Sequence, residues 1–526
     1  MACKKEPFST TIPDTAAANE NGIPIRLGKK LNNPYSVAIM RQAYKNLVNK
    51  HGYRINSDDI PNPTSMDSII VSTNTYIRVL PASDEEQELL QNDSTTEYVH
   101  FPLDYELSEG TYYQDPELPD SSYQWLYAVV DNDELPKQQR RASTLNTEVL
   151  NSDIFLPENS EYYYYFDSTF WEMLENEALN LAGYPEETGN KSVRTGNIEI
   201  FEEVYGNGVS PIERNIPLQD AKVLGRNFWR IGKGYTNAFG YFQLNKQLNG
   251  NVNFFIKWED DRVPHKFDIR AGFYGQAYSM IGKKPSGQTW KHIISKDIHG
   301  GMDIFYGSIF RGAYDFFHHD PFGIAKPTTR IKIGTKNTDG TGVNHHFYSI
   351  VGGPDITIYR YENTNVKTSY RLYSTTTHEM GHSSHRSMGV VKYNFCPKLI
   401  SESYADFIEW AFCETKYWGD IRLYNNEFRH PDVKITVDGS SPYTPLFIDL
   451  ADIGSGNSFF NKPPDDIPIN ENLQFSVLQI QEAVRKKGWA VQTDNVLDDL
   501  SAELKTLNIA NTEELDAYFN LYKNLY

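Results

Sequence analysis

The 526-residue sequence has only three cysteines, Cys3, Cys396 and Cys413, too few to imply a disulfide framework. It lacks any apolar run long enough to cross a bilayer. Basic residues are in deficit, since 50 Lys and Arg stand against 69 Asp and Glu and give a formal net charge of −19. Because phosphate binding needs a basic face, this balance argues against a nucleic-acid partner. A Gly-x-Ser-x-Gly elbow and a phosphate-binding glycine loop are also absent.

The composition is that of a soluble globular protein, with 39% hydrophobic and 23% charged residues. A chain of this length exceeds what a single core organises, so we expect several domains. Apolar patterning predicts helices at 34–48, 168–182 and 294–317, and strands at 68–71, 75–80, 347–351 and 355–361. Four glycines are costly inside the third helix and predict breaks or close packing there: Gly300, Gly301, Gly307 and Gly312.

The most informative stretch is His378-Glu379-Met380-Gly381-His382. Two histidines four residues apart face the same side of a helix, so their imidazoles can converge on one metal ion. Glu379 adjoins the first histidine and is placed to reach a water on that ion, as a general base does.

A second segment strengthens this interpretation. Glu402 follows His382 by twenty residues, and Asp406 lies four residues later on the same helix face. The surrounding residues are mostly apolar, which predicts a largely buried helix carrying two carboxylates. Buried carboxylates need partners, and a metal ion together with a ligand histidine would supply them.

Residues 374–415 resemble the active-site pattern of the gluzincins, the thermolysin-like zinc peptidases. The resemblance implies Zn²⁺ bound by His378, His382 and Glu402, with Glu379 as the catalytic base. It also implies that Asp406 supports a ligand histidine, and that Tyr393 steadies the transition-state oxyanion.

The implied activity is hydrolysis of peptide bonds in extracellular proteins or glycoproteins, with a peptide or protein as substrate. A strand above the active-site helix, 347–351 or 355–361, would hold that substrate by main-chain pairing. The alternative is a surface-anchored binding protein on a catalytically inactive zincin scaffold. Gly301-Met302-Asp303 replaces the Gly-x-Met-Glu-Asn stretch of the aminopeptidase branch, which favours an endopeptidase.

Two other histidines lie close to or after this pattern. His385 follows His382 by three residues, whereas metzincins place their third ligand six residues after the second, so His385 is expected to be a neighbour on the same helix. Gluzincins often add a late histidine that helps to hold the oxyanion, and only His430 lies downstream of the proposed ligands.

The expected fold class is multidomain α+β. Residues 1–23 are expected to be a disordered tether, and 24–195 an α+β domain whose ordering resembles uncharacterised secreted Bacteroidetes proteins that carry a zinc peptidase motif. Residues 196–260 resemble a carboxypeptidase-regulatory or transthyretin-like β-sandwich. Residues 261–526 would form a zincin-like catalytic domain with a helical C-terminal lobe.

The start of the chain resembles a mature bacterial lipoprotein. Cys3 would carry lipid, and the polar residues after it would form the tether. This resemblance implies an extracytoplasmic location, at the outer membrane or cell surface of a Gram-negative bacterium. Membrane association would then depend on the lipid alone. The oligomeric state is left open.

Overall fold

The computed structural model describes most of the chain, and the following account concerns those residues. The described ranges are 18–51, 66–119, 122–135, 146–206, 209–262, 266–285, 289–340, 342–344, 353–389, 393–421, 443–451, 475–489, 493–507 and 512–525.

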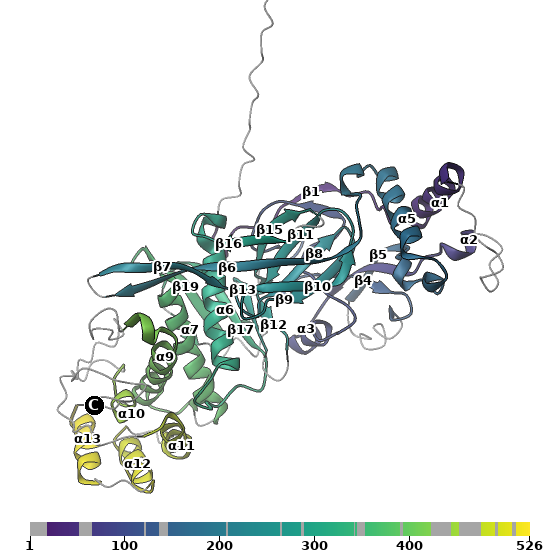
Figure 1. Ribbon diagram of the computed structural model, residues 1–526. Coiled ribbons are helices and arrows are strands. Elements are labelled where there is room, and N and C mark those ends of the chain that lie inside the picture. Colours follow the sequence, from purple (N-terminus) through teal and green to yellow (C-terminus); the bar gives the residue numbers. More distant parts are fainter. Residues whose placement is uncertain are drawn as a thin grey trace, which may run out of the picture.

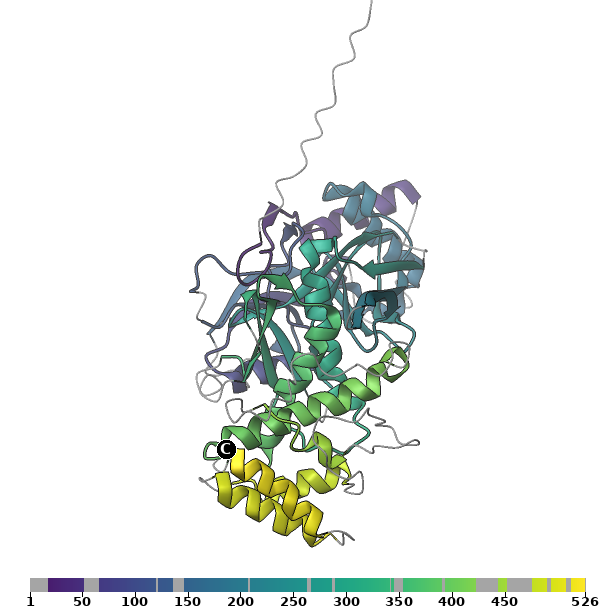
Figure 2. The same ribbon diagram turned by 90° about the vertical axis from the view of Figure 1, so that its left-hand side faces the viewer.

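The molecule is elongated and mixed α+β (Figures 1 and 2). Helices α1 (Val37–His51) and α5 (Ser168–Leu181) lie at one end, and a group of C-terminal helices lies at the other. Sheets fill the space between them. The two candidate ligand helices lie between the sheets and the C-terminal helices.

The N-terminal part pairs a small sheet with helices. The sheet has the order β4-β2-β5 and is antiparallel throughout. Helix α3 begins with Ser83 as its N-cap and three acidic residues in its first turn, a favourable arrangement for a helix start. The elements of this part are β1 (Leu27–Lys30), α2 (Met66–Ile69), β2 (Asn74–Leu80), α3 (Asp84–Gln91), β3 (Tyr105–Leu107), β4 (Leu126–Asp131) and β5 (Asn146–Ile154).

Two four-stranded sheets follow. One has the order β10-β6-β16, with β7 also paired to β6, and the other has the order β15-β11-β8-β9. Their strands are β6 (Ser192–Gly206), β7 (Val209–Pro217), β8 (Lys222–Asn227), β9 (Arg230–Tyr235), β10 (Tyr241–Leu248), β11 (Val252–Lys257), β15 (Tyr278–Lys284) and β16 (Trp290–Ile294).

A seven-stranded mixed sheet lies next to the candidate site. Its main path is β12-β13-β17-β19-β18, in which β17 runs parallel to both β13 and β19, while β18 closes one edge antiparallel to β19. The strands are β12 (Glu259–Asp260), β13 (Phe267–Ala271), β14 (Gly275–Gln276), β17 (Ile331–Asp339), β18 (Val343–Asn344), β19 (Ile356–Glu362) and β20 (Asn365–Val366).

Helices complete the fold beyond this sheet. Helix α6 (Met302–His318) is buried along almost its whole length and packs against α7 (Ser369–Ser387), which in turn packs against α9 (Lys398–Ile421). The C-terminal helices are α10 (Ile448–Ala451), α11 (Val477–Lys487), α12 (Thr493–Lys505) and α13 (Thr512–Leu525).

One hydrophobic core joins regions that the sequence analysis assigned to separate domains. Ile200 of β6, Phe305 of α6, Ile408 of α9 and Tyr522 of α13 all belong to it. The expected boundary at 195/196 falls inside β6, and β12 pairs with β13 across the boundary at 260/261. Neither position marks the end of a sheet.

Three local predictions were wrong. Residues 18–23 of the expected tether are ordered, since Asn19 Nδ2 donates to the Tyr112 hydroxyl at 2.7 Å and the backbones of Asn19 and Gly22 form a β-bridge. Cys3 lies outside the described residues. Residues 66–69 form α2, where a strand was expected from 68. The helix expected from 294 begins at Met302, because β16 occupies 290–294.

The expected effect of the glycines in this region is confirmed. Gly300 and Gly301 have φ of 57° and 79°, values that disfavour other residues, and they lie directly before α6. Within α6, a Cβ on Gly307 would lie 2.3 Å from Ile200 Cδ1, and one on Gly312 would lie 2.9 Å from Thr376 Cβ. The last contact shows how closely α6 approaches α7.

Candidate metal centre

Helix α7 carries the first three candidate residues. Its N-cap, Thr368, accepts a hydrogen bond from the backbone N–H of Arg371, which satisfies one of the free donors at a helix start. The helix is buried on most of its surface because α6, the seven-stranded sheet and α9 all pack against it. His378 and His382 therefore project from a fixed scaffold, and their ring centroids lie 4.9 Å apart.

Helix α9 approaches α7 closely at the point where the two helices carry the candidate ligands. A Cβ on Gly381 would lie only 2.9 Å from Ala405 Cα and 3.2 Å from Ile408 Cβ. The glycine next to His382 thus lets the two backbones come together. This contact brings Glu402, one turn before Ala405 on α9, to the histidine pair.

The structure brings His378, His382 and Glu402 together as predicted. Glu402 Oε2 lies 3.5 Å from His378 Nε2 and 3.1 Å from His382 Nε2, and all three ligand atoms lie within 4.8 Å of one another. Ligand bonds of about 2.0–2.1 Å in a tetrahedral zinc site put neighbouring ligand atoms roughly 3.3 Å apart. The donor set and its spacing therefore fit one zinc ion.

Two carboxylates lie next to Nδ1 of His378, the ring nitrogen that does not face Glu402. Its Nδ1 lies 3.1 Å from Asp406 Oδ1 and 3.2 Å from Glu409 Oε2. A proton on Nδ1 directed at these oxygens leaves the Nε2 lone pair facing Glu402, the tautomer that a metal ligand needs. A second possible metal-binding group consists of His378, Asp406 and Glu409. The group with two imidazoles fits a metal ion better, because it uses Nε2 of His378 and leaves Nδ1 of that ring as a hydrogen-bond donor.

The electrostatics of the site favour a cation. Burial lowers the pKa of His378, but hydrogen bonds to Asp406, Glu402 and Glu409 outweigh this effect and raise the pKa well above its usual value. Four carboxylates thus surround two imidazoles in a mostly buried space, counting Glu379. A divalent cation bound there would offset their negative charge.

Glu379 adjoins the ligand pair and also touches the edge of the sheet. Its side chain is buried, and burial raises the pKa of its carboxyl group. A Cβ on Gly342 would lie 2.3 Å from Glu379 Oε1, so the segment that leads into β18 passes directly over this carboxylate.

One of the two segments expected to hold substrate, 355–361, corresponds to β19. The first half of β19 lies between β17 and β18, so it has no free edge there, and the edge is formed by β18. The other candidate, 347–351, lies outside the described residues.

Tyr393 lies next to His382. Its hydroxyl is 3.1 Å from His382 Nδ1, on the edge of the ring opposite the nitrogen that faces Glu402. Its pKa is raised, first by burial and then by the charges of Glu402 and Glu379. His385 is a fully buried neighbour, packed among the rings of Tyr393, Tyr404 and Trp489, and burial lowers its pKa to about 3.

Sequence reasoning missed two residues of this site. Glu409 lies seven residues after Glu402, a spacing that returns to the same helix face and could have identified it. Tyr443 has its ring centroid 6.2 Å from that of His378 and is 43% exposed, so solvent reaches it beside the site. No local pattern marks Tyr443, and His430 lies outside the described residues.

Comparisons with known proteins found no matching family model, no matching curated protein and no matching solved structure. Within the described part of the chain, no helix combines the length and apolar character needed to span a membrane.

Proposed function

We propose that this chain is a zinc-dependent peptidase of the gluzincin type, built on a zincin-like catalytic domain. The observation that carries the proposal is the convergence of His378 Nε2, His382 Nε2 and one Glu402 oxygen at zinc-ligand spacing. Three protein ligands leave a coordination position open to water, which is the arrangement of catalytic zinc sites.

Zinc bound at these residues would lower the pKa of water and polarise a carbonyl oxygen. Glu379 would accept the proton of that water and pass it to the leaving amine. The raised pKa of Glu379, caused by burial, suits a group that must both take and return a proton. Asp406 and Glu409 would keep His378 in the metal-binding tautomer.

The edge strand β18 supports a peptide as the substrate. Its neighbour Gly342 lies over Glu379, and an extended chain that paired with this edge would pass beside the proposed base. Met302 and Asp303, which stand where the aminopeptidase branch has its amino-terminus-binding stretch, are buried at the start of α6. This favours cleavage within a chain.

Tyr393 and Tyr443 suit different roles in this proposal. Tyr393 is 8% exposed and its hydroxyl is engaged at Nδ1 of His382, so it suits orientation of that imidazole. Tyr443 is exposed to solvent beside His378, so it suits donation to the oxyanion that forms on the attacked carbonyl. We therefore propose Tyr443 for the oxyanion role in place of Tyr393.

The decisive experiment is Glu379→Gln in the full chain. We expect the variant to bind zinc as the parent does, measured by elemental analysis after dialysis, and to lose hydrolysis of a mixed peptide library, measured by mass spectrometry. Glu513→Gln, the same change at an exposed position of α13, is the control. A parent chain that holds zinc but cleaves no peptide would support the inactive scaffold instead.

The location of the protein belongs to this proposal. A lipid on Cys3 would hold the enzyme at the outer membrane or cell surface, where extracellular proteins and glycoproteins are its substrates. Release of the protein from membranes after Cys3→Ser, followed by fractionation, tests this assignment.

A further inference from the structure

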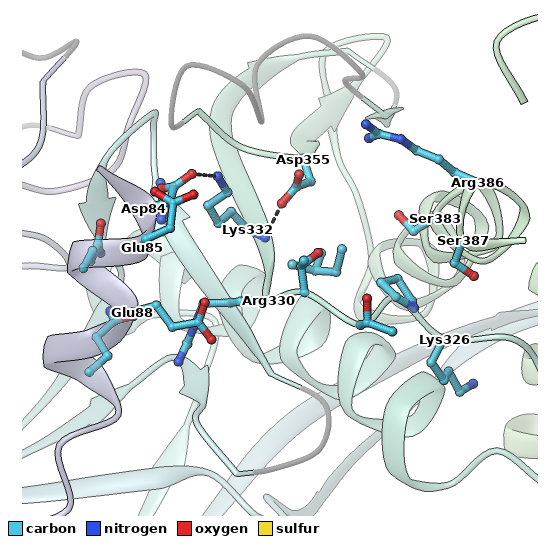
Figure 3. Close-up of a pocket in the computed structure, with 17 residues that line it drawn as sticks. Asp84, Glu85, Glu88, Lys326, Arg330, Lys332, Asp355, Ser383, Arg386 and Ser387 are labelled. Carbon is cyan, nitrogen blue, oxygen red and sulfur yellow. Dashed lines mark hydrogen bonds and ion pairs between the residues drawn. The ribbon is translucent and has the colours of Figure 1, made fainter. Parts of the chain in front are cut away.

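A pocket of about 460 Å³ opens between α3 and α7 (Figure 3). Helix α3 forms one wall, and α7 contributes Ser383, Arg386 and Ser387 to the other. The segment 326–332, which leads into β17, lies between them. The pocket is distinct from the candidate metal centre, since none of the proposed ligands lines it.

The most unusual residue of the pocket is Arg330. Its side chain is only 6% exposed, and all three of its guanidinium nitrogens lack a hydrogen-bond partner. The nearest acidic oxygen, Asp268 Oδ1, is 3.9 Å from Nη1, beyond hydrogen-bond distance. Buried charged donors are almost always hydrogen-bonded, so this one points to an acceptor that arrives with a ligand.

Other donors line the same space. Gln91 Nε2 is buried without a partner at the end of α3. Arg386 is half-buried, and Figure 3 shows its side chain extending from α7 toward the side of the pocket that carries Asp355.

The acidic residues of the pocket do not cancel these donors. Asp84 is paired with Lys332, and Asp355 accepts a hydrogen bond from the backbone N–H of Lys332. Glu85 is exposed in the first turn of α3, and Glu88 Oε1 lies 3.9 Å from Lys266 Nζ. Among the residues that line the pocket, the buried groups that lack partners are therefore donors, and they suit a carboxylate.

The pocket is connected to the proposed reaction along one face of α7. Residues 379, 383, 386 and 387 follow the helical repeat, so Glu379 and the α7 wall of the pocket lie on the same side of the helix. At 1.5 Å per residue, that wall lies about 6 to 12 Å from Glu379, which an extended peptide of roughly 3.3 Å per residue spans in two to four residues.

We infer that this pocket binds a carboxylate of the substrate two to four residues from the bond that is cleaved, with Arg330, Arg386 and Gln91 as donors. The inference rests on the proposed peptidase function. The carboxylate can be an acidic side chain or the carboxyl terminus of the substrate. Either source presents the same planar pair of acceptor oxygens to a guanidinium.

The test separates binding from turnover by using zinc-loaded full-length Glu379→Gln and calorimetric titration with blocked decapeptides. One pair differs by Glu against Gln at internal positions, and a second pair differs by a free carboxyl terminus against an amide. We expect the carboxylate member of one pair to bind roughly tenfold or more tightly, since hydrogen bonds to charged groups contribute at this level. The pair that shows the difference identifies the source.

Arg386→Gln should remove this preference, while Arg26→Gln, the same change at an exposed position outside the pocket, should keep it. Equal binding of acid and amide peptides in both pairs would overturn the inference, even if the parent chain hydrolyses peptides. Preferential binding together with no hydrolysis by the parent would uphold the carboxylate site and refute the peptidase proposal.

Discussion

Gly381 is the residue whose replacement tests the proposed metal site most directly without altering a ligand. In Gly381→Ala, the added Cβ would lie 2.9 Å from Ala405 Cα and 3.2 Å from the Ala405 carbonyl oxygen. Ordinary contacts between carbon atoms are about 3.5–4.0 Å, so α7 and α9 must separate by roughly half an ångström or more. Both obstructing atoms are backbone, so no side-chain rotation relieves the contact.

Two effects of this substitution oppose each other. Alanine favours a helix interior by about 1 kcal/mol over glycine, whereas an overpacked contact costs about 1–3 kcal/mol, so the fold should survive with a net loss of about 0–2 kcal/mol in stability. The metal site should suffer more, because ligand distances in a zinc site tolerate only about 0.2 Å. A shift of α9 carries Glu402 away from both histidines.

We therefore expect Gly381→Ala to weaken zinc binding at least tenfold, measured by competition with a chromophoric chelator, with an unchanged far-ultraviolet circular dichroism spectrum. Gly232→Ala is the matched control, since its Cβ would meet only ordinary contacts of 3.4 Å. Zinc affinity equal to that of the parent, in a folded Gly381→Ala protein, would show that the approach of α9 to α7 does not set the geometry of the site.

Three further outcomes are expected. Asp406→Ala should lower zinc affinity about 10- to 100-fold, because His378 loses a carboxylate on Nδ1; an unchanged affinity in the same competition assay would leave Glu409 as the sole support. Tyr443→Phe should reduce kcat about 10²- to 10³-fold with zinc content unchanged if Tyr443 donates to the oxyanion, and a normal kcat would reject that role. Burial lowers the pKa of His100 to about 3, so below pH 6.5 the unfolded chain binds a proton that the folded chain does not. Below pH 6.5, this site alone should lower the free energy of unfolding by about 1.4 kcal/mol for each unit by which the pH falls. In urea titrations, the loss of stability between pH 7 and pH 5 should therefore be about 2 kcal/mol smaller in His100→Asn than in the parent.

The candidate site was predictable because its geometry is local to two helices. The spacing of His378 and His382 fixes which side chains share a face of α7, and the spacing of Glu402 and Asp406 does the same for α9. The structure adds only the contact between the helices, and Gly381 makes that contact short. Glu409 follows the same helical repeat and was overlooked because it is one turn beyond the residues of the family pattern.

The arrangement of the sheets was less predictable, because neighbouring residues of one strand belong to different cores. On β11, Phe254 and Ile256 lie in the core shared with α6 and α9, whereas Phe255 belongs to a different core that contains the N-terminal residue Phe101. Apolar residues alternate along 252–258, a pattern typical of a strand with one buried face, but both faces of β11 are covered and the strand lies between two layers. Residues 196–260 were expected to form a separate sandwich because they resemble a carboxypeptidase-regulatory or transthyretin-like domain, and nothing in the local pattern tells which layer covers the second face. The pocket beside α7 was not foreseen for a similar reason. Its donors come from Gln91, Arg330 and Arg386, which are distant in the sequence and meet only because α3 lies beside the start of β17, where Lys332 pairs with Asp84. If that arrangement positions a substrate, as proposed, specificity depends on the N-terminal layer as much as on the helices that carry the proposed metal ligands.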